Sequence, residues 1–230
     1  SLKGAELIEH VRDARYEIAG LFTSAFLSDR RSPYEDITVI LNAYRRPYNL
    51  DAQIKAIREQ TRPPKQIWVW VNDHEDLNGF DFTQIDSDKV FRNDHNWKFY
   101  GRFAGALLAE TEHIAIFDDD TIPGSRWLEN CLNTMETHEG ILGSAGVILQ
   151  GDTYNPHQRC GWPTHNPEIT QVDLVGHAWF FKRDWLKYLW AEAPITWDNG
   201  EDMQFSYAAQ KYGNINTYCP PHPPSDKEFH

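Results

Sequence analysis

Three short apolar segments, each followed at once by a polar loop, constrain the fold of this chain more than any other feature of its sequence. They cover residues 37–41, 66–71 and 114–117. Nearly continuous apolar runs of this length are typical of strands covered on both faces, as in a parallel sheet. A helical pattern over 49–61 separates the first two segments and completes a strand–helix–strand unit. The sequence therefore predicts an α/β protein with a mostly parallel central sheet and helices on both faces.

The rest of the chain continues this alternation. Residues 7–26 have the spacing of an amphipathic helix. We interpret it as part of an N-terminal helical extension over residues 1–35, ahead of a single domain over 36–230. That helix either packs on the domain or belongs to a larger protein of which this chain is a fragment. The other predicted elements are helices over 102–110, 125–137 and 201–212, a helical turn over 183–190, strands over 141–149 and 172–181, and a loop region over 150–170.

Composition and charge exclude several functional classes. The chain has 230 residues, of which 40% are hydrophobic, enough for a buried core. Its formal net charge of -12 argues against a nucleic-acid partner. No apolar run approaches the roughly 20 residues of a membrane span, and the N-terminus lacks a secretory signal, so we expect a cytoplasmic protein. The cysteines are widely spaced and indicate neither a metal site nor a disulfide framework; they are Cys131, Cys160 and Cys219.

Three consecutive carboxylates, Asp118, Asp119 and Asp120, follow the apolar segment over 114–117. Ligands of open α/β sheets bind at the carboxyl ends of the strands, so this loop lies at the expected active edge. Adjacent carboxylates repel one another unless a cation neutralises them, and hard divalent cations prefer oxygen ligands. Asp118 and Asp120 are therefore predicted to hold Mn²⁺ or Mg²⁺, which can stabilise a departing nucleoside diphosphate. The alternative is a solvated acidic turn before the next helix.

Four motifs, in their order and spacing, resemble the GT-A fold of glycosyltransferases, a Rossmann-like fold of nucleotide-diphospho-sugar transferases. The motifs are segments 37–47, 69–73, 101–105 and 117–120. The chain is similar in particular to family 2-like enzymes and to the exostosin-type enzymes of family 64. This resemblance implies a metal-dependent glycosyltransferase. Such an enzyme moves a sugar from a nucleotide-sugar donor, with UDP as the favoured nucleotide, to a hydroxyl of a glycan or another acceptor.

The resemblance also implies a donor site. Tyr44 would stack on the nucleotide base, Asp73 would accept hydrogen bonds from the base or ribose, and Arg102 would contact the nucleotide or its phosphates. Each has an ordinary alternative as a surface-loop residue, a turn residue or a solvated charge. The predicted nucleotide-sugar-binding residues are Asn42, Ala43, Tyr44, Arg46, Asp73, Arg102, Asp118 and Asp119.

An acidic pair, Glu201 and Asp202, opens the predicted helix over 201–212. The resemblance makes this pair catalytic: Asp202 would be the general base of an inverting enzyme. In a retaining enzyme the pair would orient the acceptor or stabilise the transition state. The alternative is a capping role, since a helix dipole favours carboxylates at its N-terminus. The resemblance further implies that His177 and Trp179 contact the acceptor and that His222 is a third metal ligand.

Other functional classes are less consistent with these motifs. The run over 114–121 is similar to haloacid-dehalogenase-type phosphatases, but Ile122 stands where that motif has Thr. A nucleotidylyltransferase would need a glycine-rich loop after the first strand, and residues 42–47 contain no glycine. A non-catalytic sugar-binding domain would explain the many aromatic residues but not the aspartates. The chain also ends sooner after the acidic pair than family 2 enzymes do, which leaves the acceptor open.

Overall fold

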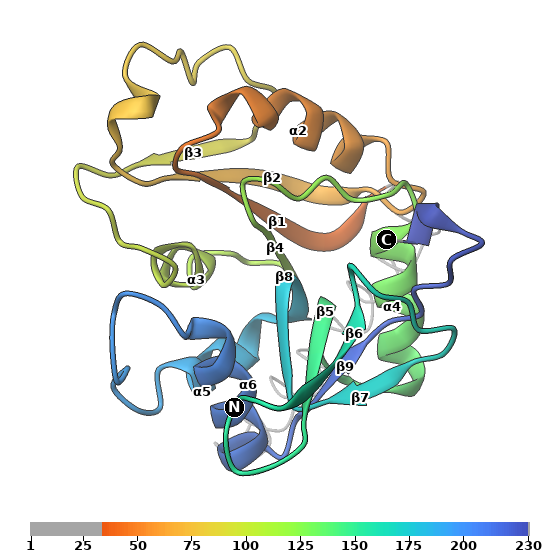
Figure 1. Ribbon diagram of the computed structural model, residues 1–230. Coiled ribbons are helices and arrows are strands. Elements are labelled where there is room, and N and C mark those ends of the chain that lie inside the picture. The colour runs from red at the N-terminus through yellow and green to blue at the C-terminus, as the bar shows by residue number, and fades with distance from the viewer. Residues whose placement is uncertain (1–33, 230) are drawn as a thin grey trace, which may run out of the picture. The chain divides into compact units, whose positions relative to one another are not determined.

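A nine-stranded mixed sheet organises residues 34–229, the part of the chain that the computed structural model describes (Figure 1). The strand order is β3-β2-β1-β4-β8-β5-β9-β7, and β6 pairs with β5 outside this path. Strands β1 to β4 are parallel, β8 is antiparallel to β4 and β5, and β9 is parallel to β5. Six strands, β1 to β5 and β9, thus share one direction. The strands are β1 (Glu35–Ala43), β2 (Pro64–Val71), β3 (Lys89–Arg92), β4 (His113–Phe117), β5 (Gly140–Leu149), β6 (His157–Gly161), β7 (Thr170–Val172), β8 (Leu174–Lys182) and β9 (Asn216–Cys219).

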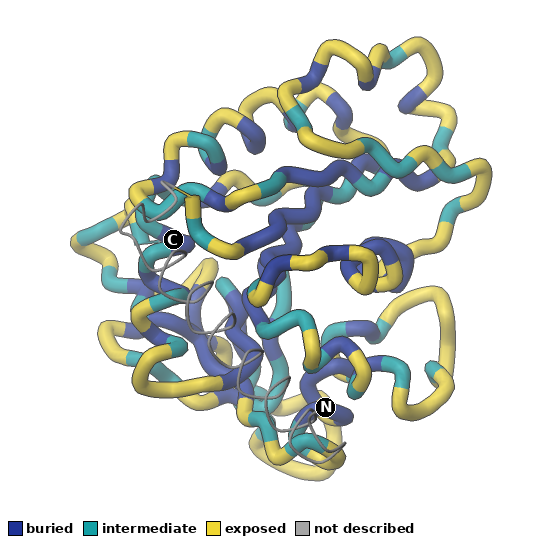
Figure 2. Tube along the Cα trace, turned by 180° about the vertical axis from the view of Figure 1, so that it is seen from behind, coloured by how far each residue is buried: buried dark blue, intermediate teal, exposed yellow. Residues whose placement is uncertain are grey.

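Helices cover both faces of the sheet and create two apolar cores. One core contains α2 and α4, and the other contains α3, α5 and α6. In β1, Val39 and Leu41 belong to the first core and Ile40 to the second, because successive side chains of a strand point to opposite faces. The buried strand residues form a band between the helices (Figure 2). The helices are α2 (Leu50–Arg58), α3 (Gly101–Ala106), α4 (Trp127–Thr137), α5 (Leu186–Leu189) and α6 (Glu201–Gly213), with 3₁₀ turns η1 (Pro47–Asn49), η2 (Glu75–Leu77), η3 (Arg183–Trp185) and η4 (Lys227–Phe229).

The predicted fold class is confirmed, but several elements differ in extent. The strand predicted over 172–181 is interrupted at Asp173, whose amide donates to the carbonyl of Val147 at 2.8 Å and whose carboxylate accepts from the amide of Leu149 at 2.7 Å. The helix predicted over 102–110 ends at Ala106. The loop region predicted over 150–170 contains β6, which pairs with β5 as a hairpin. The first three residues of β6 are not buried, so its sequence has no apolar pattern. Strands β3 and β9 have four residues each, too few for periodicity to identify.

The predicted helix over 7–26 lies outside the described residues, as does most of the predicted extension over 1–35. Within residues 34–229, no helix combines the length and apolar character needed to cross a membrane. The three cysteines are buried free thiols. In the proline-rich segment after β9, His222 forms an isolated antiparallel β-bridge with Asn166. The last residues then pack by α4, where Arg126 forms an ion pair with Asp226 at 3.1 Å.

Candidate active site

The candidate active site lies at the edge of the sheet where β1, β2 and β4 end. These strands are parallel, so their carboxyl-terminal loops meet at one edge. Strand β8 arrives in the opposite direction and pairs Ala178 with Phe117, so its first residues reach the same edge. There the amide of Asp118 donates to the carbonyl of His177 at 3.3 Å. The predicted donor residues and the predicted acceptor residue His177 are therefore neighbours.

A buried arginine joins the aspartate loop to α6. Arg102, in α3, is 1% exposed, and its guanidinium forms ion pairs with Asp118 and, at 3.1 Å, with Glu201. Its charge also lies 4.8 Å from the ring centre of Trp179. Burial raises the pKa of Glu201 to about 7, and the nearby Arg102 opposes that rise. Arg102 thus holds carboxylates from two distant parts of the chain in one network.

The loop of three aspartates is also fixed from the side of α2. The side-chain amide of Asn49 donates to the carbonyl of Asp119 at 2.8 Å. The side-chain amide of Gln53 donates to the carbonyls of Asp118 at 2.8 Å and Thr121 at 2.7 Å. Gln53 is fully buried, and its two bonds satisfy backbone carbonyls of the aspartate loop. The backbone of the loop is therefore rigidly supported, whatever its side chains bind.

The side chains of the second and third aspartates face a basic loop. Arg46 lies 2.8 Å from a carboxylate oxygen of Asp119 and 3.4 Å from one of Asp120. Asp119 is the principal cause of the raised pKa of Arg46. Arg45, which the sequence analysis did not select, donates its amide to Asp119 at 3.4 Å and pairs with Asp76 at 3.3 Å. The loop after β1 therefore brings the guanidinium of Arg46 and the backbone amide of Arg45 to the aspartates, next to the predicted diphosphate position.

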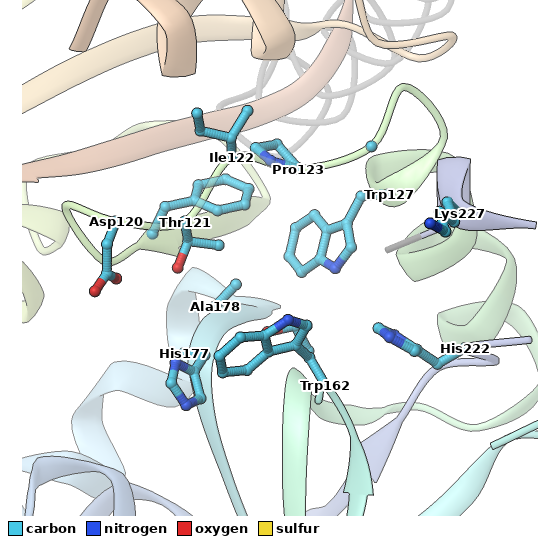
Figure 3. Close-up of a pocket in the computed structure, with 13 residues that line it drawn as sticks. Asp120, Thr121, Ile122, Pro123, Trp127, Trp162, His177, Ala178, His222 and Lys227 are labelled. Carbon is cyan, nitrogen blue, oxygen red and sulfur yellow. The ribbon is translucent and has the colours of Figure 1, made fainter. Parts of the chain in front are cut away.

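A cavity of about 580 Å³ opens beside Asp120. Asp120, whose side chain is 54% exposed, lies with His177 toward one end and His222 toward the other (Figure 3). The indole rings of Trp127 and Trp162 lie between these ends (Figure 3). The cavity thus combines aromatic walls with polar groups, as ligand-binding pockets do. Its other lining residues are Phe117, Thr121, Ile122, Pro123, Gly124, Ser144, Ala178 and Lys227.

The three predicted metal ligands are not gathered into one preformed site. Among residues 34–229, no group of three or more His, Cys, Asp or Glu side chains lies in an arrangement that could hold a metal ion. Asp118 is paired with Arg102, and His222 is buried. The exposed carboxylate of Asp120 still fits a hard cation, because Mg²⁺ is usually held by one or two carboxylates together with substrate phosphates and water.

The loops after β1 and β2 meet through a buried asparagine that the sequence analysis missed. The side-chain amide of Asn72 donates to Asn42 at 3.3 Å and to the carbonyl of Lys98 at 3.1 Å. Its oxygen accepts from the indole of Trp70 at 3.1 Å and from the amide of Trp97 at 3.2 Å. Its position directly after an apolar strand was the available signal. Asn72 therefore fixes the loop that is predicted to hold the nucleotide.

The remaining predicted donor residues border this loop. The ring of Tyr44 lies edge-on to that of His74, with ring centres 4.7 Å apart. Asp73 is exposed, and its amide donates to the carbonyl of His95 at 3.4 Å. Ala43 is buried at the end of β1. A planar ligand could thus meet Tyr44 and Asp73 from the solvent side.

The structure separates the two predicted acceptor residues. His177 has a left-handed backbone (φ 66°), and its ring centre is 4.9 Å from that of Trp162. Strained backbone of this kind is concentrated at functional sites. The acceptor prediction for Trp179 is wrong, because this side chain is 2% exposed and packs in the core against Phe103. The left-handed backbone of His177 interrupts the alternation of side chains along β8, so His177 lines the cavity together with Ala178 while Trp179 packs in the core on the other face.

The acidic pair divides between interior and surface. Both carboxylates border a second cavity of about 390 Å³, but Glu201 is buried and paired with Arg102, whereas Asp202 is only partly buried. Burial is the main cause of the raised pKa of Asp202. A Cβ atom placed on Gly176 would lie 3.8 Å from Oδ2 of Asp202, which shows how closely this carboxylate approaches the start of β8. Asp202 is thus adjacent to the edge that carries Asp118.

The family model described as "Glycosyl transferase family 2" matches residues 38–190, which include the aspartate loop and its supports. The chain belongs to glycosyl transferase family 2. The motifs are therefore those of a glycosyltransferase and not of a phosphatase or a non-catalytic sugar-binding domain. Asp202 lies beyond the matched segment, so its role rests on the geometry and on the resemblance.

The chain is also similar to a curated glycosyltransferase in sequence and to solved structures in fold. The chain is 27% identical over 100 residues to the glucosyl-dolichyl phosphate glucuronosyltransferase of Haloferax volcanii, a match that covers 42% of this chain and 32% of that protein. It is similar in fold to S. aureus TarS 1-349 in complex with UDP, with a TM-score of 0.56 and 15% identity over 80% of this chain and 57% of that one. A longer TarS structure gives a TM-score of 0.54 and 16% identity over 82% and 37%. The fold is therefore GT-A, and this family 2 domain spans less than two thirds of these relatives.

Proposed function

We propose that this family 2 domain transfers a sugar from a UDP-sugar to a hydroxyl group of a glycan or another acceptor, with the help of Mn²⁺ or Mg²⁺. The observation that carries the proposal is the meeting of Asp118, Asp119 and Asp120 with Asp202 at one sheet edge, within a domain of this family. UDP is favoured because S. aureus TarS, a protein of the same fold, was solved in complex with UDP.

The donor is proposed to lie across the carboxyl ends of β1, β2 and β4. Tyr44 and Asp73 would contact the base and ribose, beside the loop that Asn72 fixes. Arg46 would exchange its ion pairs with Asp119 and Asp120 for the diphosphate, whose oxygens suit a planar guanidinium. The carboxylates released in this way face the same position.

A bound Mn²⁺ or Mg²⁺ would be held by Asp120, with Asp118 and His222 as further candidate ligands, and it would supply positive charge to the leaving diphosphate. Oxygens of the diphosphate are well suited to complete such a site. This explains how the domain could bind a cation with donor even though the protein ligands alone form no cluster within residues 34–229.

Asp202 is proposed as the general base. Its carboxylate accepts the proton of the acceptor hydroxyl while the hydroxyl oxygen attacks the anomeric carbon of the donor sugar. The bond from that carbon to the phosphate oxygen breaks, and its electron pair leaves with the nucleoside diphosphate. Glu201, buried on Arg102, holds the network in place and remains unreactive. This direct displacement inverts the anomeric centre.

Calorimetric titration with UDP, GDP, ADP and CDP, each in Mn²⁺ and in chelator, tests the donor site. We expect UDP to bind with Mn²⁺ and to bind about tenfold or more weakly in chelator or with Asp120→Asn. Asp202→Asn should keep the affinity for UDP and lose hydrolysis of UDP-sugars, a reaction that uses water as acceptor. Absence of binding by every nucleotide, or full activity of Asp202→Asn, would refute the corresponding part of the proposal.

A further inference from the structure

The second cavity beside Asp202 is a groove built from three separate parts of the chain. Phe99 comes from the segment before α3, Tyr154 from the loop between β5 and β6, and Met203 from the start of α6. Asn199, Gly200, Glu201 and Asp202 complete its lining. These segments, distant in sequence, meet beside the proposed base. The groove, of about 390 Å³, therefore lies where an acceptor hydroxyl would have to arrive.

The walls of this groove expose apolar surface that a soluble domain would normally bury. Phe99, Tyr154 and Met203 are 45%, 44% and 45% exposed. Binding sites for small ligands commonly pair aromatic walls with a few polar groups that orient the ligand. Here the polar groups are the carboxylate of Asp202 and the amide of Asn199. A sugar ring, with apolar faces and a polar rim, matches this combination.

The wall that carries Phe99 is held in place by its neighbours. Lys98 adopts a left-handed backbone (φ 54°); its amide donates to the side chain of Asn96 at 2.9 Å and its carbonyl accepts from Asn72 at 3.1 Å. The strained turn is thus maintained by two side chains, which is expected where position matters. The ring of Phe99 lies 5.8 Å from the charge of Arg102, directly over the buried network.

The opposite wall is tied to the same segment. Lys98 lies 3.8 Å from Asp198, and the ring of Trp197 packs edge-on against Tyr100 with centres 5.3 Å apart. These contacts link the loop before α6 to the segment before α3. A groove with restrained walls loses less conformational entropy when a ligand binds.

The charges of the groove restrict its ligand. None of its lining residues is a Lys or Arg, and two of them are carboxylates. The nearby Arg102 is already paired with Asp118 and Glu201. An acceptor sugar with a carboxylate or phosphate at this position would meet repulsion without compensation. The chain as a whole carries a formal net charge of -12, which also disfavours an anionic lipid surface.

We propose that this groove is the acceptor site and that it binds an uncharged sugar unit, with Phe99 and Tyr154 against the ring and Asp202 at the reacting hydroxyl. This inference rests on the proposed function and adds the chemical class of the acceptor. It also replaces Trp179, which is buried, with side chains that an acceptor can reach.

The test measures binding of methyl glycosides to the domain saturated with UDP and Mn²⁺, by saturation-transfer NMR. The probes are the methyl glycosides of glucose, galactose, mannose and N-acetylglucosamine, and the matched methyl glucuronide. We expect at least one neutral glycoside to bind and the glucuronide to bind more weakly than the glucoside. Phe99→Ala and Tyr154→Ala should each weaken binding about tenfold without changing the affinity for UDP. Tyr207→Ala is the matched control, since Tyr207 is an exposed tyrosine of α6 outside the groove.

Several results would overturn this inference. Tighter binding of the glucuronide would refute the charge argument, and unchanged glycoside binding in both groove variants would move the acceptor elsewhere. Sedimentation with phosphatidylcholine vesicles that depends on Phe99 would identify the groove as a lipid contact instead. Absence of glycoside binding while UDP binds would reject the groove but leave the proposed function intact. Failure of the wild-type domain to bind any nucleotide would reject the proposed function itself.

Discussion

Replacing Arg102 with Met tests whether the buried ion-pair network stabilises the domain. Arg102 is 1% exposed and Glu201 6%, so the substitution leaves a buried carboxylate without its cation. Removing one partner of a buried pair typically costs about 3–5 kcal/mol. We expect a loss of this size in the free energy of unfolding near pH 8, where Glu201, with a pKa of about 7, is mostly ionised. Urea denaturation followed by circular dichroism measures it.

The pH dependence and two further variants make this expectation specific. Near pH 5 the loss should be smaller, because Glu201 is protonated there and needs no cation. Arg46→Met removes an arginine that is 44% exposed and should cost under about 1 kcal/mol. The double variant Arg102→Met with Glu201→Gln should lose less than the sum of the single variants by at least about 1 kcal/mol. A loss for Arg102→Met no larger than that for Arg46→Met, or independent of pH, would refute the reasoning.

Three other expectations follow from the same geometry. In the folded domain the carboxyl of Glu201 keeps its proton up to about pH 7, whereas in the unfolded chain it loses the proton near pH 4.5. The free energy of unfolding should therefore fall as the pH rises through this window, and Glu201→Gln should remove that slope. A slope that persists in Glu201→Gln contradicts the assignment. Because burial raises the pKa of Asp202, donor hydrolysis should rise with pH through a value above the ordinary aspartate range; a profile that is flat there argues against this base. Gly161→Ala should lower the thermal stability strongly, since φ is +68° and a Cβ atom would collide with the carbonyl of Ser144. Gly151→Ala is the control, because a Cβ atom there meets nothing within 4 Å and should change the thermal stability little. Equal unfolding midpoints of the two variants in scanning calorimetry would contradict this expectation.

The central strands could be predicted because they are buried on both faces. Ile40 and Leu41 lie in different cores, so their segment is apolar at all positions but Thr38 and is easy to recognise. The hairpin strand β6 and the edge strand β3 carry no such run, since each has at least one face in solvent. Long, doubly buried segments thus carry a local signal, whereas strands that depend on a partner do not.

The sequence predicts which residues form the candidate site, but it does not predict the hydrogen bonds and ion pairs that join them. The aspartate loop is visible because its charges follow a strand directly. Asn72 and Gln53 are ordinary polar residues in sequence, and only the fold shows that they satisfy buried backbone and side-chain groups. The acceptor contact that the resemblance implied for Trp179 fails because this side chain lies in the core. The left-handed backbone of His177 interrupts the alternation along β8, which the sequence does not reveal. Side-chain direction at the sheet edge is set by tertiary pairing.

The division of the acidic pair follows from helix geometry. Neighbouring residues on a helix are about 100° apart, so Glu201 and Asp202 cannot both face the same partner. Gly200, with φ 86°, begins α6 at an orientation that sends Glu201 inward to Arg102. Both carboxylates border the groove, and Asp202 is the less buried of the two, which makes it the member of the pair that we propose to meet an acceptor. Arg102 also pairs with Asp118 on the proposed donor side. A bound donor that displaces Asp118 would therefore change the ion pair between Arg102 and Glu201, the residue before the proposed base. The proposed donor and acceptor sites are thus joined by a single buried side chain, that of Arg102.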